Sequence, residues 1–272
     1  MYQRELDIAI DLARQASDIA MEIYARDFSH VEKANDAGPV TEADLRINEF
    51  LVNALREAFP EDAVIGEESP AEELASSARR RWIIDPIDGT KDFLQKNGEF
   101  SVMIGLAVDG RAELGVVAVP AHRQIYAGAP GHGAFMLDEH GTRTTLRVNT
   151  AIAAQDATIV NSRNHPDATI DFIRDEIGIT REYRHGSVGC KVAHISEGRA
   201  DLYVNLSGKC HWWDVAGPEA IVREAGGVVL TLEGGELRYT GTSTRIAEPF
   251  FASNAAISEA VMGAAKRALA SH

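Results

Sequence analysis

The segment at residues 82–90 constrains this chain more than any other part of its sequence. It reads Trp-Ile-Ile-Asp-Pro-Ile-Asp-Gly-Thr, so an apolar, β-branched stretch ends in two carboxylates, Asp85 and Asp88. Hard cations such as Mg²⁺ need rigidly held carboxylate oxygens, with water or phosphate completing the octahedral shell. Pro86 fixes one backbone torsion, and Gly89 allows a tight turn whose amides approach a ligand. An ordinary turn uses the same residue types, but the pattern favours a strand that carries a metal site at its end.

Charge narrows the class of partner. The formal net charge is −14, from 27 basic and 41 acidic residues. Such a surface repels nucleic-acid polymers and anionic membranes. It can still bind a small phosphate ester when divalent cations mediate the contact. Composition therefore favours a metal-dependent enzyme with a small phosphorylated substrate over a nucleic-acid binder.

The length and the termini favour a globular protein of the cytoplasm. The 272 residues are enough for one large domain or two small ones. No stretch approaches the ~20 apolar residues of a transmembrane segment, and the N-terminus lacks a signal-peptide pattern. Cys190 and Cys210 fit no paired metal motif, so we expect two small buried side chains and no required disulfide.

Periodicity and turn signals divide the chain into two parts. Asp109-Gly110 is a strong hairpin signal in the first part. Helices are predicted at about 4–25, 42–59, 166–178, 189–198, 215–225 and 256–270, and a polar loop at 33–39. Strands are predicted at about 63–66, 81–85, 101–108, 112–119, 158–161, 200–204 and 228–232, with the antiparallel sheet continuing to about 138. We expect an N-terminal α+β subdomain at 1–150 and a C-terminal α/β subdomain at 151–272, packed tightly.

Three further acidic residues accompany the first two. Glu67 follows a short apolar strand, and Asp214 opens the helix predicted at 215–225. Asp44 lies in a Thr-x-x-Asp capping pattern. Each has a simple local explanation, as a solvated turn or as a helix cap. Together, Glu67, Asp85, Asp88 and Asp214 offer enough anionic oxygen for two or three Mg²⁺ ions, which can clamp an in-line phosphoryl displacement.

Groups beside this cluster can handle water and phosphate. The Thr90 hydroxyl could orient a water molecule, and Asp44 could accept a hydrogen bond from Thr90. The free amides of Gly89 and Thr90 could receive phosphate oxygens, as could the N-terminus of a helix after Gly186-Ser187.

The four ordered motifs resemble the inositol monophosphatase superfamily of lithium-sensitive, Mg²⁺-dependent phosphatases. They are Pro-Val-Thr-Glu-Ala-Asp at 39–44, Gly-Glu-Glu-Ser at 66–69, Asp-Pro-Ile-Asp-Gly-Thr at 85–90 and Trp-Asp-Val-Ala-Gly at 213–217. The resemblance spans about residues 4–265 and implies a five-layered αβαβα sandwich. It implies metal ligation by Glu67, Asp85, the Ile87 carbonyl, Asp88 and Asp214. It assigns catalysis to Thr90, Asp44 and Glu67, and substrate contacts to Asp88, Gly89, Thr90, Gly186, Ser187 and Asp214.

Within the superfamily, the closest pattern is that of the 3′(2′),5′-bisphosphate nucleotidases. Lys-Asp-Phe at 91–93, Asn-Gly-Glu-Phe at 97–100 and Gly-Cys-Lys at 189–191 resemble their motifs. Lys191 could supply the cation that a second phosphate needs, although a surface helix lysine is an equally simple interpretation. The Gly186-Ser187 pair and Val-Ala-Gly at 215–217 look more like the inositol phosphatase pattern.

The sequence therefore predicts a phosphomonoesterase that removes the 3′-phosphate of adenosine 3′,5′-bisphosphate. An inositol-1-phosphate or broad sugar-phosphate phosphatase is the alternative within the class. A catalytically silent regulatory binding protein is the alternative from another class. A homodimer is compatible with the resemblance, since many relatives of the inositol branch are dimers.

Overall fold

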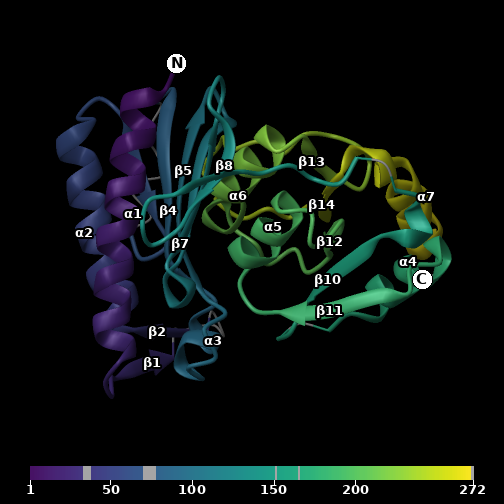
Figure 1. Cartoon of the computed structure of the whole chain (residues 1–272), viewed down its shortest axis with the longest axis horizontal. Coiled ribbons are helices and arrows are strands. Elements are labelled where there is room, and N and C mark those ends of the chain that lie inside the picture. The colour runs from purple at the N-terminus through teal and green to yellow at the C-terminus, as the bar shows by residue number, and fades with distance from the viewer. Residues whose placement is uncertain (33–37, 70–77, 151, 165, 271–272) are drawn as a thin grey trace.

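The computed structural model describes residues 1–32, 38–69, 78–150, 152–164 and 166–270. Helices and sheets alternate in five layers, αβαβα, as Figure 1 shows from left to right. The predicted sandwich is confirmed. Most of the predicted loop at 33–39 lies outside the described residues. In the described part of the chain, no helix is both long enough and apolar enough to span a bilayer.

Two long helices form the first layer, α1 (Gln3–Tyr24) and α2 (Glu42–Ala58). The buried stripe of α1 is rich in alanine, which lets the helix lie close to the sheet. The capping box predicted for α2 is present, since the Thr41 hydroxyl accepts a hydrogen bond from the Ala43 amide at 3.1 Å. In return, the Thr41 amide donates to Asp44 Oδ2 at 2.7 Å. This cap fixes the Asp44 side chain at the start of the helix.

The second layer is a seven-stranded sheet within the described residues, in the order β3-β4-β5-β6-β7-β8-β9. Strand β3 runs parallel to β4, and the other pairs are antiparallel. The strands are β3 (Ala63–Gly66), β4 (Arg80–Asp88), β5 (Ser101–Val108), β6 (Arg111–Val119), β7 (Gln124–Ala129), β8 (Gly133–Leu137) and β9 (Arg143–Thr145). The hairpin at Asp109-Gly110 is confirmed, with φ of 50° and 76° at its two turn residues. The sheet extends past the predicted limit of about 138, because β9 adds to β8.

Three short elements lie near the end of β4. Strands β1 (His30–Glu32) and β2 (Pro39–Thr41) pair with each other antiparallel. Helix α3 (Thr90–Leu94) follows β4 after Gly89, whose φ is +91°. That left-handed conformation favours glycine, so the chain can turn directly from the strand into the helix.

The fourth layer is a five-stranded mixed sheet in the described residues, in the order β11-β10-β12-β14-β13. Its strands are β10 (Thr158–Ser162), β11 (Arg181–His185), β12 (Leu202–Asn205), β13 (Gly227–Thr231) and β14 (Phe250–Asn254). Strands β11 and β14 were not predicted. Polar β11 lies at the sheet edge and pairs with β10. Buried β14 lies between β12 and β13, antiparallel to both. Helices α4 (Ala168–Ile177) and α7 (Ser258–Ala270) cover the outer face as the fifth layer.

Helices α5 (Val188–Ser196) and α6 (Trp212–Glu224) form the central layer between the sheets. The backbone of α6 lies directly on strands β5 and β6. A Cβ atom added to Gly115 would lie 1.9 Å from the Gly217 carbonyl oxygen, and one added to Gly105 would lie 2.8 Å from the Gly217 amide. Glycine therefore permits backbone contact between sheet and helix. The predicted two-subdomain division near residue 150 stays a prediction.

The predicted start of the helix at 215 is wrong, because α6 begins at Trp212. The His211 amide donates to Asp214 Oδ2 at 2.5 Å, which closes a capping box across the first turn. Asp214 therefore lies inside the first turn rather than before the helix. An Asp at this third helical position stabilises the N-terminus in the same way as the usual Glu.

A buried carboxylate on α6 predicts a pH dependence of stability. Burial raises the pKa of Glu219 to about 7, although the Tyr239 hydroxyl donates to it at 2.5 Å. The unfolded chain releases this proton near the ordinary pKa of 4.5, so stability should fall as the pH rises from 4.5 to 7 and then level off. Glu219→Gln should remove about 3 kcal/mol of this dependence.

Urea unfolding of the wild-type protein and of Glu219→Gln across this pH range measures the difference, with Glu49→Gln, an exposed residue of α2, as the control variant. An unchanged dependence on pH in Glu219→Gln would contradict the assignment.

Candidate active site

An acidic cluster lies where β4 ends and α6 begins. Asp85 and Asp88 lie at the carboxyl end of β4, and Asp214 lies in the first turn of α6. Each of the three offers one oxygen, and these oxygens lie within 4.8 Å of one another. Glu67 follows β3, the parallel neighbour of β4, and its amide donates to the Ile84 carbonyl at 3.1 Å. The two strands therefore end at the same edge, which brings Glu67 near Asp85, while α6 contributes Asp214 from the other half of the chain.

The cluster has the electrostatics of a cation site. Asp85 is 1% exposed, and its Oδ1 has no hydrogen-bond partner within the described residues. Burial raises the pKa of Asp85 well above its usual value, and the charges of Glu67 and Asp88 raise it further. Burial likewise raises the pKa of Asp214, as does the charge of Asp88. Because buried like charges are unfavourable unless something compensates them, these residues fit one or more divalent cations.

Asp88 has a second set of contacts, which fix its orientation. Its Oδ2 accepts hydrogen bonds from the Gly189 amide at 2.8 Å and from the Ser187 hydroxyl. Ser101 donates to the same oxygen at 3.4 Å. Burial raises the pKa of Asp88, while the Lys191 charge and these donors oppose the shift. One carboxylate oxygen is thus held by the N-terminus of α5, and the other can serve an ion.

Thr90 and Asp44 lie side by side, as the sequence predicted. The Thr90 hydroxyl lies 3.4 Å from Asp44 Oδ1 and 3.1 Å from the Ile87 carbonyl oxygen. Asp44 is fully buried, and its Oδ2 accepts from the Thr41 amide and hydroxyl at 2.7 and 2.5 Å. The capping box of α2 therefore fixes the carboxylate that faces Thr90. The Ile87 carbonyl, predicted as a metal ligand, lies against the same hydroxyl.

The Gly186-Ser187 turn contacts the acidic cluster through the hydrogen bond from Ser187 to Asp88. Ser187 caps α5 by accepting a hydrogen bond from the Cys190 amide at 3.0 Å. The Asp88 carboxylate occupies the N-terminus of α5, where the sequence predicted a phosphate oxygen. Lys191 is 2% exposed, and its ammonium group donates to the carbonyls of Gly186 and Ser187 at 2.9 and 2.7 Å. Lys191 is therefore not the surface lysine considered above.

Sequence reasoning missed four polar residues around this turn. Glu99 accepts a hydrogen bond from the Gly186 amide. It belongs to the Asn-Gly-Glu-Phe motif, which in the sequence indicates only the branch of the superfamily. Asp92 accepts from Asn164, and Arg163 pairs with Glu99. The motif at 97–100 was a usable signal for Glu99. No local pattern marks Arg163 or Asn164, which follow strand β10.

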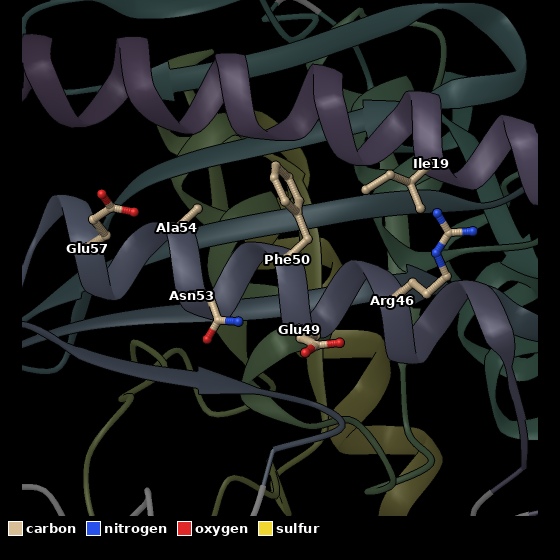
Figure 2. A pocket seen from close by; sticks show the side chains of 7 residues that line it. All are labelled: Ile19, Arg46, Glu49, Phe50, Asn53, Ala54 and Glu57. Carbon is tan, nitrogen blue, oxygen red and sulfur yellow. The ribbon is translucent and has the colours of Figure 1, made fainter.

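A separate hollow of about 520 Å³ lies on the outer surface between α1 and α2 (Figure 2). Its lining includes Ile19, Phe50 and Glu57. None of the predicted site residues lines it. The acidic cluster, with its buried carboxylates, is therefore the candidate active site.

Known proteins share both the sequence and the fold. Residues 1–268 match the model of the inositol monophosphatase family. The 3′(2′),5′-bisphosphate nucleotidase CysQ of Escherichia coli K12 is 35% identical over 240 residues, which cover 86% of this chain and 94% of that protein. Inositol monophosphatase 2 of Rattus norvegicus is 31% identical over 239 residues, covering 85% and 81% of the two chains.

This chain superimposes on the solved structure of the Thermotoga maritima IMPase with a TM-score of 0.83 at 28% identity. The match covers 99% of this chain and 99% of that chain. The family match spans almost the entire sequence, and the layers and the acidic cluster agree with it. This chain belongs to the inositol monophosphatase family of phosphatases.

Proposed function

We propose that the protein is a Mg²⁺-dependent phosphomonoesterase that removes the 3′-phosphate from adenosine 3′,5′-bisphosphate. The observation that carries the metal-dependent part is the buried Asp85 Oδ1, which has no hydrogen-bond partner in the described part of the chain and lies among carboxylates from both halves. The similarity to CysQ and the motif at 97–100 support the nucleotide as substrate. Two or three Mg²⁺ ions would be held by Glu67, Asp85, the Ile87 carbonyl, Asp88 and Asp214.

The chain's own residues would orient the attacking water. Bound Mg²⁺ would polarise the phosphate and stabilise the charge that develops on its oxygens. Thr90 Oγ1 would accept a hydrogen bond from the water while donating its own hydrogen bond to Asp44 Oδ1, which lies 3.4 Å away. Glu67, at the same edge, would hold the water from another side. The water oxygen would then bond to phosphorus in line as the bond from phosphorus to the 3′-oxygen breaks. The water proton would pass through Thr90 Oγ1 to Asp44, and the leaving 3′-oxygen would take up a proton from solvent.

Backbone amides and Lys191 would bind the substrate. The amides at Gly89 and Thr90 begin α3 and can receive phosphate oxygens, while Asp88 and Asp214 would face the same group through the ions. The Lys191 ammonium group is 2% exposed, donates to two backbone carbonyls and lies over the Tyr203 ring, so its positive charge would act on the second phosphate from behind the Gly186-Ser187 turn. Gly186 and Ser187 would form the wall beside it. The cytoplasmic location and the homodimer stay predictions.

A second candidate is an inositol or sugar phosphatase, which the 31% identity to the rat inositol monophosphatase favours. The two candidates differ in whether a second phosphate is bound. Contacts from charged groups to that phosphate should raise kcat/KM for adenosine 3′,5′-bisphosphate about 10- to 100-fold over inositol 1-phosphate.

Phosphate release from both esters in Mg²⁺, with chelator as the blank, measures this ratio. Chromatography should identify adenosine 5′-monophosphate as the product, because only the 3′-phosphate is removed. A preference for inositol 1-phosphate would replace the first candidate with the second. No Mg²⁺-dependent turnover of either ester would favour a catalytically silent binding protein.

A further inference from the structure

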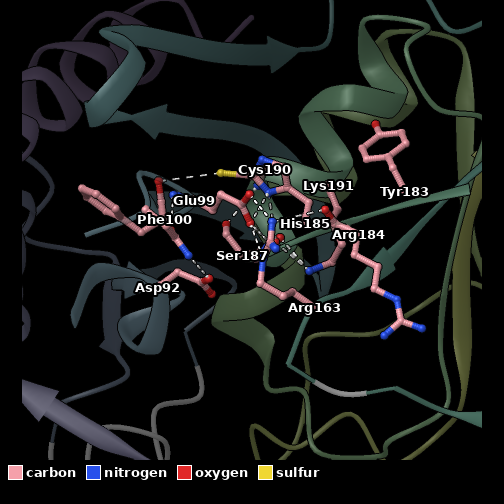
Figure 3. Close-up of polar contacts among 12 residues, drawn as sticks. Asp92, Glu99, Phe100, Arg163, Tyr183, Arg184, His185, Ser187, Cys190 and Lys191 are labelled. Atoms are coloured by element: carbon pink, nitrogen blue, oxygen red, sulfur yellow. Dashed lines mark hydrogen bonds and ion pairs between the residues drawn. The ribbon is translucent and has the colours of Figure 1, made fainter. Parts of the chain in front are cut away.

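The turn at Gly186-Ser187 is held by hydrogen bonds on both sides. The Lys191 ammonium group binds its two carbonyls, while Glu99 Oε2 accepts the Gly186 amide at 2.7 Å. Figure 3 shows Glu99, Ser187 and Lys191 grouped at this turn, with dashed lines marking the bonds. Side chains therefore satisfy both carbonyls of the turn and the Gly186 amide.

Glu99 also joins the two halves of the chain. It precedes β5, whereas its partner Arg163 follows β10 in the other sheet. Arg163 Nε donates to Glu99 Oε2 at 3.0 Å, and the second nitrogen of the guanidinium pairs with Oε1. Burial opposes ionisation here, but the bonds from Arg163 and Gly186 hold the pKa of Glu99 below its usual value. Glu99 is thus a carboxylate in a two-pronged pair.

The space around the turn leaves it little freedom. A Cβ atom on Gly186 would lie 2.5 Å from Asp92 Oδ2 and 2.7 Å from the Glu99 carbonyl oxygen. Asp92 is itself buried and fixed by the side-chain amides of Asn97 at 2.6 Å and Asn164 at 2.8 Å. The motif at 97–100 therefore supports the turn through two of its members, Asn97 and Glu99.

The far side of the turn contacts the acidic cluster. The Ser187 hydroxyl and the Gly189 amide both donate to Asp88 Oδ2. Ser187 adopts a positive φ of 39° with a ψ of 131°, a conformation outside the left-handed helical region that a non-glycine residue holds only when its surroundings enforce it. Loss of the Glu99 contact would let this residue relax and carry its hydroxyl away from Asp88.

We propose that Glu99 is a positioning residue for the metal site. Its carboxylate holds the Gly186-Ser187 turn so that Ser187 and Gly189 fix Asp88 in the orientation that binds Mg²⁺. Arg163 supports Glu99 from the other half of the chain. This inference rests on the proposed function, because it assigns Asp88 to the ion. Partners of this kind around a metal ligand typically contribute 10- to 100-fold in affinity.

Calorimetric titration of the full-length protein with Mg²⁺ tests this assignment. Glu99→Ala should weaken binding about 10- to 100-fold, and Glu99→Gln should recover most of the loss, since its amide oxygen can still accept from Gly186. Turnover of Glu99→Ala should rise toward the wild-type rate as Mg²⁺ is increased, which a merely destabilised enzyme would not do. The matched control is Glu236→Ala, which removes another ion pair between the halves, Arg111–Glu236.

The outcomes separate the two proposals. Wild-type protein that binds no Mg²⁺ overturns the proposed function and this inference with it. Normal wild-type binding with an unchanged affinity in Glu99→Ala overturns the inference alone. If Glu99→Ala does not fold, Arg163→Ala decides. Arg163→Ala should weaken binding less than tenfold but measurably, and wild-type affinity in this variant overturns the inference.

Discussion

Asp85→Asn should reduce kcat/KM at least about 10³-fold, because it removes the charge at the centre of the cluster. Asp85 is the buried carboxylate that faces the charges of Glu67, Asp88 and Asp214, and its Oδ1 has no protein partner within the described residues. Metal ions contribute several kcal/mol to such reactions, and each factor of ten in rate corresponds to about 1.4 kcal/mol. Steady-state kinetics across a Mg²⁺ series measures the loss.

The same substitution should have the opposite effect on the stability of the metal-free protein. Burial and neighbouring charge raise the pKa of Asp85, so in chelator the folded state loses stability as the pH rises through the titration of this group. Asn carries no charge, and the variant should unfold at a higher temperature than wild type in chelator. Mg²⁺ should reverse that order.

Asp201→Asn is the matched control for this experiment. Asp201 is also buried, but it accepts hydrogen bonds from Asn149 and the Thr158 amide beside the second sheet. We expect it to lower stability and to leave Mg²⁺-dependent turnover close to wild type. Wild-type turnover in Asp85→Asn would mean that this cluster does not hold the catalytic ion.

Thr90→Ala should slow turnover by roughly 10²- to 10³-fold and leave Mg²⁺ affinity nearly unchanged. The hydroxyl lies between Asp44 Oδ1 and the Ile87 carbonyl oxygen, and positioned acid–base groups contribute this much to rate. Removing it leaves the four carboxylates in place. Kinetics at saturating Mg²⁺, together with calorimetric titration of the ion, separates the rate from the affinity.

Thr90→Ser keeps the hydroxyl and should retain most of the activity, which makes it the control for packing. If Thr90→Ala instead weakens Mg²⁺ binding as strongly as it slows turnover, Thr90 serves the ion rather than the water.

Short sequence patterns predict the elements that are stabilised by contacts between neighbouring residues. The capping box at Thr41 and Asp44 is contained in four consecutive residues, and the hairpin at Asp109-Gly110 in two. Local patterns predict two apolar strands that each end at a carboxylate, but not the parallel pairing of β3 and β4 that brings those ends together. Residue chemistry groups the four carboxylates as a candidate metal cluster, and the family resemblance adds the Ile87 carbonyl to the ligand set.

Other features depend on partners distant in the chain. Strand β11 is polar and pairs only at the sheet edge, and β14 is fully buried, so neither shows the alternation of a half-buried strand. The contact between Glu99 and Gly186 spans 87 positions. Lys191 reads as an exposed helix lysine until the turn before α5 brings its own carbonyls to the ammonium group.

The glycine contact between β6 and α6 has a consequence for how ligands reach the site. At Gly115 and Gly217 the two backbones are in direct contact, with no side chains between them. This contact therefore has no side chains that could repack to allow movement. Asp214 is thereby tied to the sheet that carries Asp85 and Asp88. A hinge opening between the two halves would break this backbone contact. Ions and substrate should therefore enter a site that is already formed.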